Sequence, residues 1–181
     1  MRADAARNLA TVLRTGARLL AEDPSTSMAA IATASGVDRT TIHRRFASRE
    51  ALLRAVFHAK LDASERVLDE ARLTEAPVPV ALHRYLEGII PVSRDWPVDT
   101  RRMMQQDPEA RDRRDALSRR LDTFLLRAAD EGYLRADVDA DWTRATLGRL
   151  VDTVAHDFPS MDAPQAADLV ADTFLNGLGA R

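Results

Sequence analysis

Apolar residues recur along most of the chain at steps of three and four positions, the spacing that places them on one face of an α-helix. No segment shows the sustained apolar and polar alternation that indicates a strand, and aromatic residues make up only 5% of the chain. The pattern therefore predicts an all-α protein of about nine helices. In the first twenty residues the helical stripe consists of Ala6, Leu9, Ala10, Leu13, Ala17 and Leu20.

Capping residues and prolines set the expected ends of these helices. The first helix should end before Pro24, and Ser27, Asp38 and Ser48 should each cap the start of a later one. Pro91 should end the fifth helix, because proline removes a backbone donor. After the first helix, the expected helices cover residues 28–34, 39–46, 49–73, 80–90, 108–131, 141–157 and 163–178.

Composition limits the kinds of protein that this chain can be. No stretch approaches the roughly 18 consecutive apolar residues of a membrane-spanning helix, so no membrane partner is expected. The N-terminus has dispersed arginines and does not resemble a secretory signal. The absence of cysteine excludes disulfides, thiol nucleophiles and zinc fingers. These features together predict a cytoplasmic location.

Charge is distributed unevenly, although the formal net charge is only −2. Residues 1–66 contain eleven basic and seven acidic side chains, a net charge of +4, which leaves −6 on the remainder. A basic first third on an acidic body suggests that one end of the molecule meets a polyanion. A chance partition of charges is the alternative.

Residues 28–46 contain spacing typical of a helix-turn-helix. Small Ala32 allows a second helix to cross closely, Gly36 can adopt the positive φ of a tight turn, and Ile42 fills the space between the two helices. The second helix then projects polar and basic side chains outward, as a DNA recognition helix does. These side chains are Arg39, Thr40, Thr41, His43, Arg44 and Arg45.

This segment resembles the TetR family of transcriptional regulators. The match is "SMAAIATASGVDRTTIHRRFASREALLRAVF", residues 27–57. The resemblance implies a helix-turn-helix DNA-binding domain over residues 1–47 and a helical effector-binding and dimerisation domain over residues 48–181. The implied function is that of a ligand-responsive repressor, which binds a palindromic operator as a homodimer and is released by a small-molecule effector.

The same resemblance suggests roles for matching residues. Thr41 matches a hydroxyl that contacts backbone phosphate, and Arg49 stands where a lysine binds phosphate near the positive end of a helix. Arg44 occupies a variable position suited to reading guanine, and Arg39 could read a base or grip phosphate. The expected DNA-binding residues are therefore Arg39, Thr40, Thr41, His43, Arg44, Arg45 and Arg49.

Three positions depart from the family pattern or have a structural alternative. His43 replaces the usual tyrosine, so a titratable donor replaces a neutral one. Thr40 replaces a small residue that allows close approach to the groove, and Arg45 occupies a position that often packs or pairs within the head. The hydroxyl of Thr40 and the imidazole of His43 can still donate hydrogen bonds, which keeps both residues among the candidates.

The second half of the chain offers candidates for an effector pocket and a dimer face, by resemblance and by their apolar character. Plain core packing within one subunit is the alternative for both sets. The pocket candidates are Phe57, Leu61, Tyr85, Ile89, Trp96, Met103, Met104 and Phe124. The dimer candidates are Leu147, Leu150, Val151, Val154, Leu169, Val170, Phe174 and Leu178.

An enzyme is the competing class, but the expected chemistry is missing. The four histidines lack metal-ligand spacing, and there is no glycine-rich phosphate loop. "DVDAD", residues 137–141, resembles the start of a calcium loop, yet the required glycine and glutamate are replaced, and we interpret it as a loop that caps the next helix. No catalytic, metal or cofactor site is therefore predicted. A helical interaction module whose basic head binds an acidic partner remains a second alternative.

Overall fold

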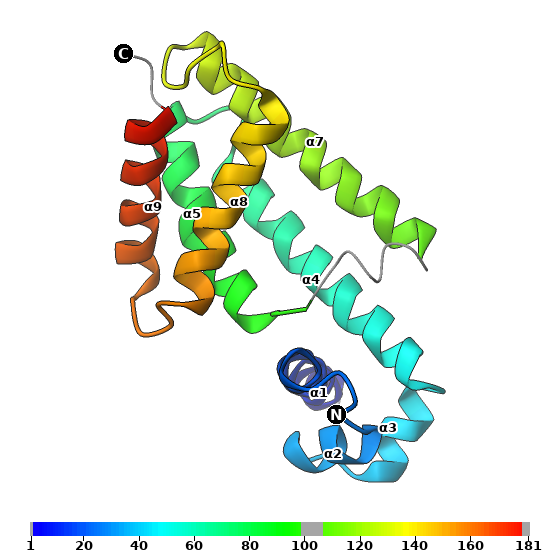
Figure 1. Cartoon of the computed structure of the whole chain (residues 1–181). Coiled ribbons are helices and arrows are strands. Elements are labelled where there is room, and N and C mark those ends of the chain that lie inside the picture. Colours follow the sequence, from blue (N-terminus) through cyan, green and yellow to red (C-terminus); the bar gives the residue numbers. More distant parts are fainter. Residues whose placement is uncertain (1, 99–106, 179–181) are drawn as a thin grey trace. The chain divides into compact units, whose positions relative to one another are not determined.

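The computed structural model describes residues 2–98 and 107–178, with side chains from residue 8 to residue 177. Every regular element in these ranges is an α-helix (Figure 1), which confirms the all-α class, with eight helices where about nine were expected. The helices are α1 (Arg2–Glu22), α2 (Met28–Ala34), α3 (Arg39–Arg45), α4 (Arg49–Ala71), α5 (Val78–Asp95), α7 (Pro108–Asp130), α8 (Ala140–His156) and α9 (Ala163–Leu178). None of these described helices is long and apolar enough to cross a bilayer.

The helices form two compact units. The first contains the described residues of 1–62 and 95–111, and the second contains those of 63–94 and 112–178. Helix α4 runs through the boundary between the two, so its first part belongs to one unit and its last part to the other.

In the first unit, α1 packs against α2 and the start of α4 at Gly16. A Cβ added to Gly16 would lie 3.6 Å from Ile31, 3.8 Å from Leu52 and 3.9 Å from Val56. The absence of a side chain at this position therefore lets three elements approach closely. Of the predicted apolar stripe of α1, Leu13, Ala17 and Leu20 are buried, as their spacing predicts. Leu9 is half-buried, Ala10 is exposed, and the side chain of Ala6 lies outside the described ones.

In the second unit, the last part of α4 is packed together with α5, α7, α8 and α9 around one apolar core. Gly88 of α5 contacts α4 so closely that an added Cβ would lie 2.8 Å from the side chain of Val67. Two arginines of α7 add polar links, since Arg120 pairs with Asp69 at 2.7 Å and Arg127 donates to the carbonyl oxygen of Ala76 at 2.8 Å.

The prediction that Pro91 ends the fifth helix is wrong, because α5 continues through Pro91 to Asp95. Proline inside a helix costs about 3 kcal/mol or more. Tertiary contacts hold the last turn: Ile90 and Ser93 are buried, and Arg94 donates to the carbonyl oxygens of Val154 and Phe158. These contacts offset the lost backbone hydrogen bond.

Other expected helix ends are confirmed. Helix α1 ends at Glu22, before Pro24. The side chain of Ser48 accepts a hydrogen bond from the backbone N–H of Ala51, in the first turn of α4. Asp139 caps α8 by accepting from the backbone N–H of Trp142. This cap confirms that "DVDAD" caps a helix, which begins within the motif at Ala140.

Candidate nucleic-acid interface

The turn between α2 and α3 is built by backbone hydrogen bonds around Gly36. The N–H of Val37 donates to the carbonyl oxygen of Ala32, and the N–H of Gly36 donates to that of Thr33. This pairing closes the end of α2, and it requires the left-handed conformation that Gly36 adopts at φ +67°. The side chain of Ser27 caps the other end of α2 by accepting from the N–H of Ala30 at 3.1 Å.

Helix α3 begins at a cap made by Asp38. Its Oδ1 accepts from the backbone N–H of Thr40 at 2.7 Å and from the hydroxyl of Thr40 at 2.6 Å. These hydrogen bonds stabilise the carboxylate, the one from the Thr40 hydroxyl most, and hold the pKa of Asp38 below its usual range. The hydroxyl of Thr40 is therefore engaged within the protein.

One side of α3 is buried and the other is exposed. Ile42 and Phe46 are buried at 1% and 7% exposure and anchor the helix to the head. The six residues that were predicted to point outward are all exposed: Arg39, Thr40, Thr41, His43, Arg44 and Arg45. The helix thus combines an apolar anchor with a polar outer surface, as a recognition helix requires.

The basic side chains of α3 have no ion-pair partner among the residues that the structure describes. This holds for Arg39, His43, Arg44 and Arg45. In the second unit, by contrast, Arg113, Arg120 and Arg144 each pair with an acidic residue. The exposed arginines of α3 are therefore available to an external anion.

Arg49 is placed differently from the other candidates. It is half-buried at the start of α4, and its guanidinium donates to the backbone carbonyl oxygen of Pro24 in the loop between α1 and α2. Part of its hydrogen-bonding capacity is therefore used within the head. The spacing along the sequence gives no signal of this contact, because the two residues are 25 positions apart.

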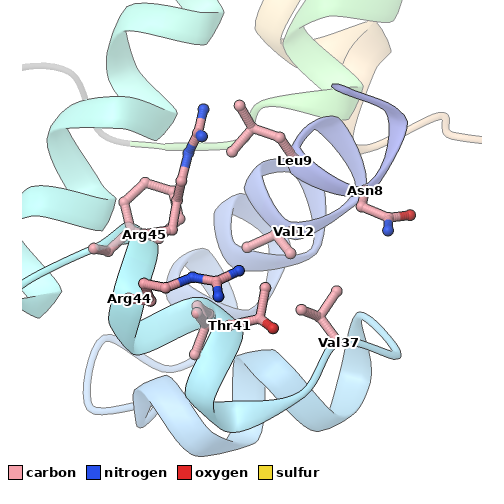
Figure 2. A pocket seen from close by; sticks show the side chains of 9 residues that line it. Asn8, Leu9, Val12, Val37, Thr41, Arg44 and Arg45 are labelled. Atoms are coloured by element: carbon pink, nitrogen blue, oxygen red, sulfur yellow. The ribbon is translucent and has the colours of Figure 1, made fainter. Parts of the chain in front are cut away.

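A groove of about 340 Å³ runs between α1 and α3. Figure 2 shows Arg44 extending beside Thr41 into the space between the two helices, next to Val12. The apolar floor includes Leu9, Val12 and the anchors of α3. Asn8, Leu9 and Val12 of α1 border the recognition surface. The apolar stripe of α1 predicts only packing, so the sequence pattern gives no signal for this position. The lining residues are Asn8, Leu9, Val12, Val37, Thr41, Ile42, Arg44, Arg45 and Phe46.

The effector-pocket candidates are divided between the two units. Phe57, Leu61 and Trp96 are buried in the first unit, and Tyr85 and Phe124 are buried in the second, where Ile89 is half-buried. Burial raises the pKa of Tyr85, with a further contribution from the charge of Asp152. Met103 and Met104 lie outside the described residues. The effector pocket stays a prediction.

Most of the dimer candidates lie in the core of their own chain, which was the alternative for these stripes. Five of them are nearly inaccessible, because α8 and α9 pack into the second unit. Leu150 is half-buried and Leu169 is 47% exposed, so both retain surface for a partner. The side chain of Leu178 lies outside the described ones. The five core residues are Leu147, Val151, Val154, Val170 and Phe174.

A capped first helix, a turn at a left-handed glycine and an exposed cationic second helix together define a helix-turn-helix unit. Residues 12–56, which contain this unit, match the family model of bacterial regulatory proteins of the tetR family. This match covers the helix-turn-helix region of the chain and agrees with the motif resemblance.

Known relatives extend the match beyond the head. The transcriptional repressor LfrR of Mycolicibacterium smegmatis is 36% identical to this chain over 82 residues. These residues are 45% of this chain and 43% of LfrR, so the aligned part spans less than half of the repressor. A crystal structure of LfrR in complex with proflavine matches 97% of this chain and 99% of that one, with a TM-score of 0.73 and 25% identity. PfmR from Thermus thermophilus shares the fold, with a TM-score of 0.71, 21% identity, and 91% and 97% coverage.

Proposed function

We propose that this protein is a transcriptional repressor that binds double-stranded operator DNA through α3 and is released by a small-molecule effector. Residues 1–47 form the DNA-binding part, and residues 48–181 form the effector-binding and dimerisation part. The protein acts in the cytoplasm, needs no cofactor and is not an enzyme.

The observation that carries this proposal is the unpaired, exposed cationic surface of α3. Arg39, Arg44 and Arg45 are exposed and lack ion-pair partners within the described chain. Two anchors, Ile42 and Phe46, hold this surface in a fixed orientation. Phosphates and guanine edges are the anionic and acceptor groups that such arginines bind in DNA.

The proposal of a homodimer rests on what one head can read. A single helix-turn-helix contacts too few base pairs for strong specificity, whereas a two-fold pair reads the two halves of a palindrome about 34–36 Å apart. Helices α8 and α9 provide the dimer face, through Leu150, Leu169 and their neighbours. Apolar exposure at Leu169 supports this assignment.

Release by an effector is supported by the family and by the relative with a bound ligand. The LfrR structure contains proflavine, a flat aromatic cation, which makes proflavine a suitable first probe for this chain. The pocket candidates in the body supply buried aromatic side chains of the kind that enclose such molecules. Proflavine can displace DNA only if it binds the DNA-free form of the protein more tightly than the DNA-bound form.

Fluorescence anisotropy with the promoter region next to the protein's own coding sequence tests the proposal. We expect binding to this duplex at least about 1,000-fold tighter than to a random duplex of equal length, the lower end for specific regulators. Titrations at several salt concentrations separate specific binding from general phosphate attraction, which weakens steeply with salt. Equal affinity for both duplexes would refute the operator proposal, and a sequence-independent preference for acidic polymers would favour an acidic protein partner.

A further inference from the structure

The outward face of α3 is centred on Thr40 and Arg44. At 3.6 residues per turn, successive side chains are rotated by about 100° around the helix. The buried anchors Ile42 and Phe46 mark the inner face. Thr40 and Arg44 lie within about 40° of the direction opposite to these anchors. Of the candidates on α3, these two should therefore come closest to the base edges in the major groove of bound DNA.

The hydrogen bond between Thr40 and Asp38 has only one possible donor. The carboxylate of Asp38 is ionised at neutral pH, because the ordinary pKa of aspartate is about 3.9 and the pKa of Asp38 is lowered further in the folded protein. An ionised carboxylate can only accept. The proton between Oδ1 of Asp38 and Oγ1 of Thr40, which are 2.6 Å apart, must therefore come from the hydroxyl of Thr40.

A hydroxyl has one proton and two lone pairs. Since the proton of Thr40 is directed at Asp38, the exposed side of its oxygen presents lone pairs alone. Phosphate oxygens also only accept, so Thr40 in this state cannot bind phosphate. In the major groove, guanine and thymine present acceptors, whereas adenine offers the N6 amino group and cytosine the N4 amino group as donors.

We infer that Thr40 is a specificity-determining residue that accepts a hydrogen bond from an exocyclic amino group, on adenine or cytosine, in the major groove of the operator. This inference rests on the proposed function. It revises the expectation that the hydroxyl of Thr40 donates to DNA. Thr40 and Arg44 then form a complementary pair, because the guanidinium of Arg44 can only donate and is suited to guanine.

The spacing of this pair limits where the two bases lie. Residues four apart on a helix are separated by about 6 Å along its axis, and successive bases on one strand by about 3.4 Å. Each operator half-site should therefore contain a guanine and, within about two base steps, an adenine or cytosine whose amino group meets Thr40.

The experiment compares full-length wild type with Thr40→Val and Thr40→Ser on the operator from the promoter titration. The position that Thr40 reads is the one where Thr40→Val changes the base preference. At that position adenine is then replaced by purine, or cytosine by 2-pyrimidinone, which removes only the amino group. Wild type and Thr40→Ser should lose roughly threefold to tenfold in affinity, the value of one hydrogen bond, and Thr40→Val should lose nothing further.

Asp38→Ser supplies a second variant, because serine keeps an N-cap but removes the carboxylate that takes the proton of Thr40. At the position that Thr40 reads, wild type should bind adenine or cytosine more tightly than guanine or thymine. In Asp38→Ser this difference in affinity should become smaller. A uniform loss across all duplexes in Thr40→Val would overturn the inference in favour of a phosphate contact. A loss on replacing thymine by uracil would overturn it in favour of a methyl contact. In both cases the preference for the operator over random DNA would persist, so the proposed function would stand.

Discussion

The guanidinium of Arg49 donates to the carbonyl oxygen of Pro24, which joins the start of α4 to the loop between α1 and α2. Nε of Arg49 is buried and has no hydrogen-bond partner among the described residues. In the same loop, hydrogen bonds from Ser25 lower the pKa of Asp23, and the positive charge of Arg49 contributes. Arg49 therefore stabilises the head from within, whether or not it also reaches phosphate.

Substitutions at Arg49 can separate these two roles. Arg49→Ala should lower the free energy of unfolding by about 1–2 kcal/mol, since it removes a charged hydrogen bond to a carbonyl. Arg49→Lys keeps the charge but not the planar guanidinium and should recover only part of the stability. Thermal unfolding measures this loss.

The salt dependence of DNA binding gives the independent readout for Arg49. If Arg49 also binds phosphate, the slope of log affinity against log salt should fall by about one per subunit, and so by about two for the dimer, in Arg49→Ala and be restored in Arg49→Lys. An unchanged slope in both variants would mean that Arg49 acts only through the loop.

The head was largely predictable from the sequence because its determinants are local. Ser27 and Asp38 were predicted as caps from residue type and position, and Gly36 was predicted to adopt positive φ. These features depend on neighbours within a few residues. The contact between Arg49 and Pro24 was not predictable, because it depends on how α1 and α4 are folded together.

The second unit was less predictable, because its structure depends on contacts between residues that lie far apart in the sequence. Pro91 was expected to end a helix, but contacts of the following turn with α8 keep that helix intact. The stripe that includes Leu147 and Val154 was expected to face a partner, yet both side chains are buried in their own subunit. A hydrophobic stripe indicates burial without identifying the surface that covers it.

Gly36→Ala should destabilise the head by about 1–2 kcal/mol, because an alanine at positive φ is strained. A Cβ at Gly36 would meet nothing within 4 Å, so crowding makes no contribution. Gly148→Ala is the matched control: it also has open space, but it lies inside α8 with no positive φ. The control should gain about 0.5–1 kcal/mol. Chemical denaturation measures both, and equal changes in the two variants would contradict the assignment of strain to Gly36.

Acid should weaken the start of α7 through Asp107. Its Oδ1 accepts from the N–H of Ala110 at 3.0 Å, and its Oδ2 lies 3.2 Å from Nε2 of His58. The hydrogen bond from Ala110 is the main cause that lowers the pKa of Asp107, followed by the interaction with His58. Because the folded pKa lies below the unfolded one, the stabilisation is fully present above the unfolded value of about 3.9. It is lost as pH falls through the folded value.

Asp107→Asn tests this acid effect, since asparagine preserves an N-cap without a titrating carboxyl. The free energy of unfolding of wild type and variant should be compared between pH 7 and pH 3. The difference between them should shrink as pH falls below about 4, where the Asp107 carboxyl becomes protonated in the unfolded chain while it is still ionised in the folded protein. A constant difference over this range would show that the charge of Asp107 contributes nothing to stability.

Dimerisation through α9 predicts opposite outcomes for two similarly exposed leucines. Leu169 of α9 is 47% exposed and Leu126 of α7 is 56% exposed. In a two-fold dimer each substitution occurs twice, and burial of a leucine is worth about 1.5–3 kcal/mol. Because about half of the Leu169 side chain is already covered in the monomer, Leu169→Lys should raise the dimer dissociation constant about 10-fold to 100-fold, whereas Leu126→Lys should leave it unchanged. Sedimentation equilibrium measures both. If Leu126→Lys dissociates the dimer and Leu169→Lys does not, α7 forms the dimer interface instead of α9.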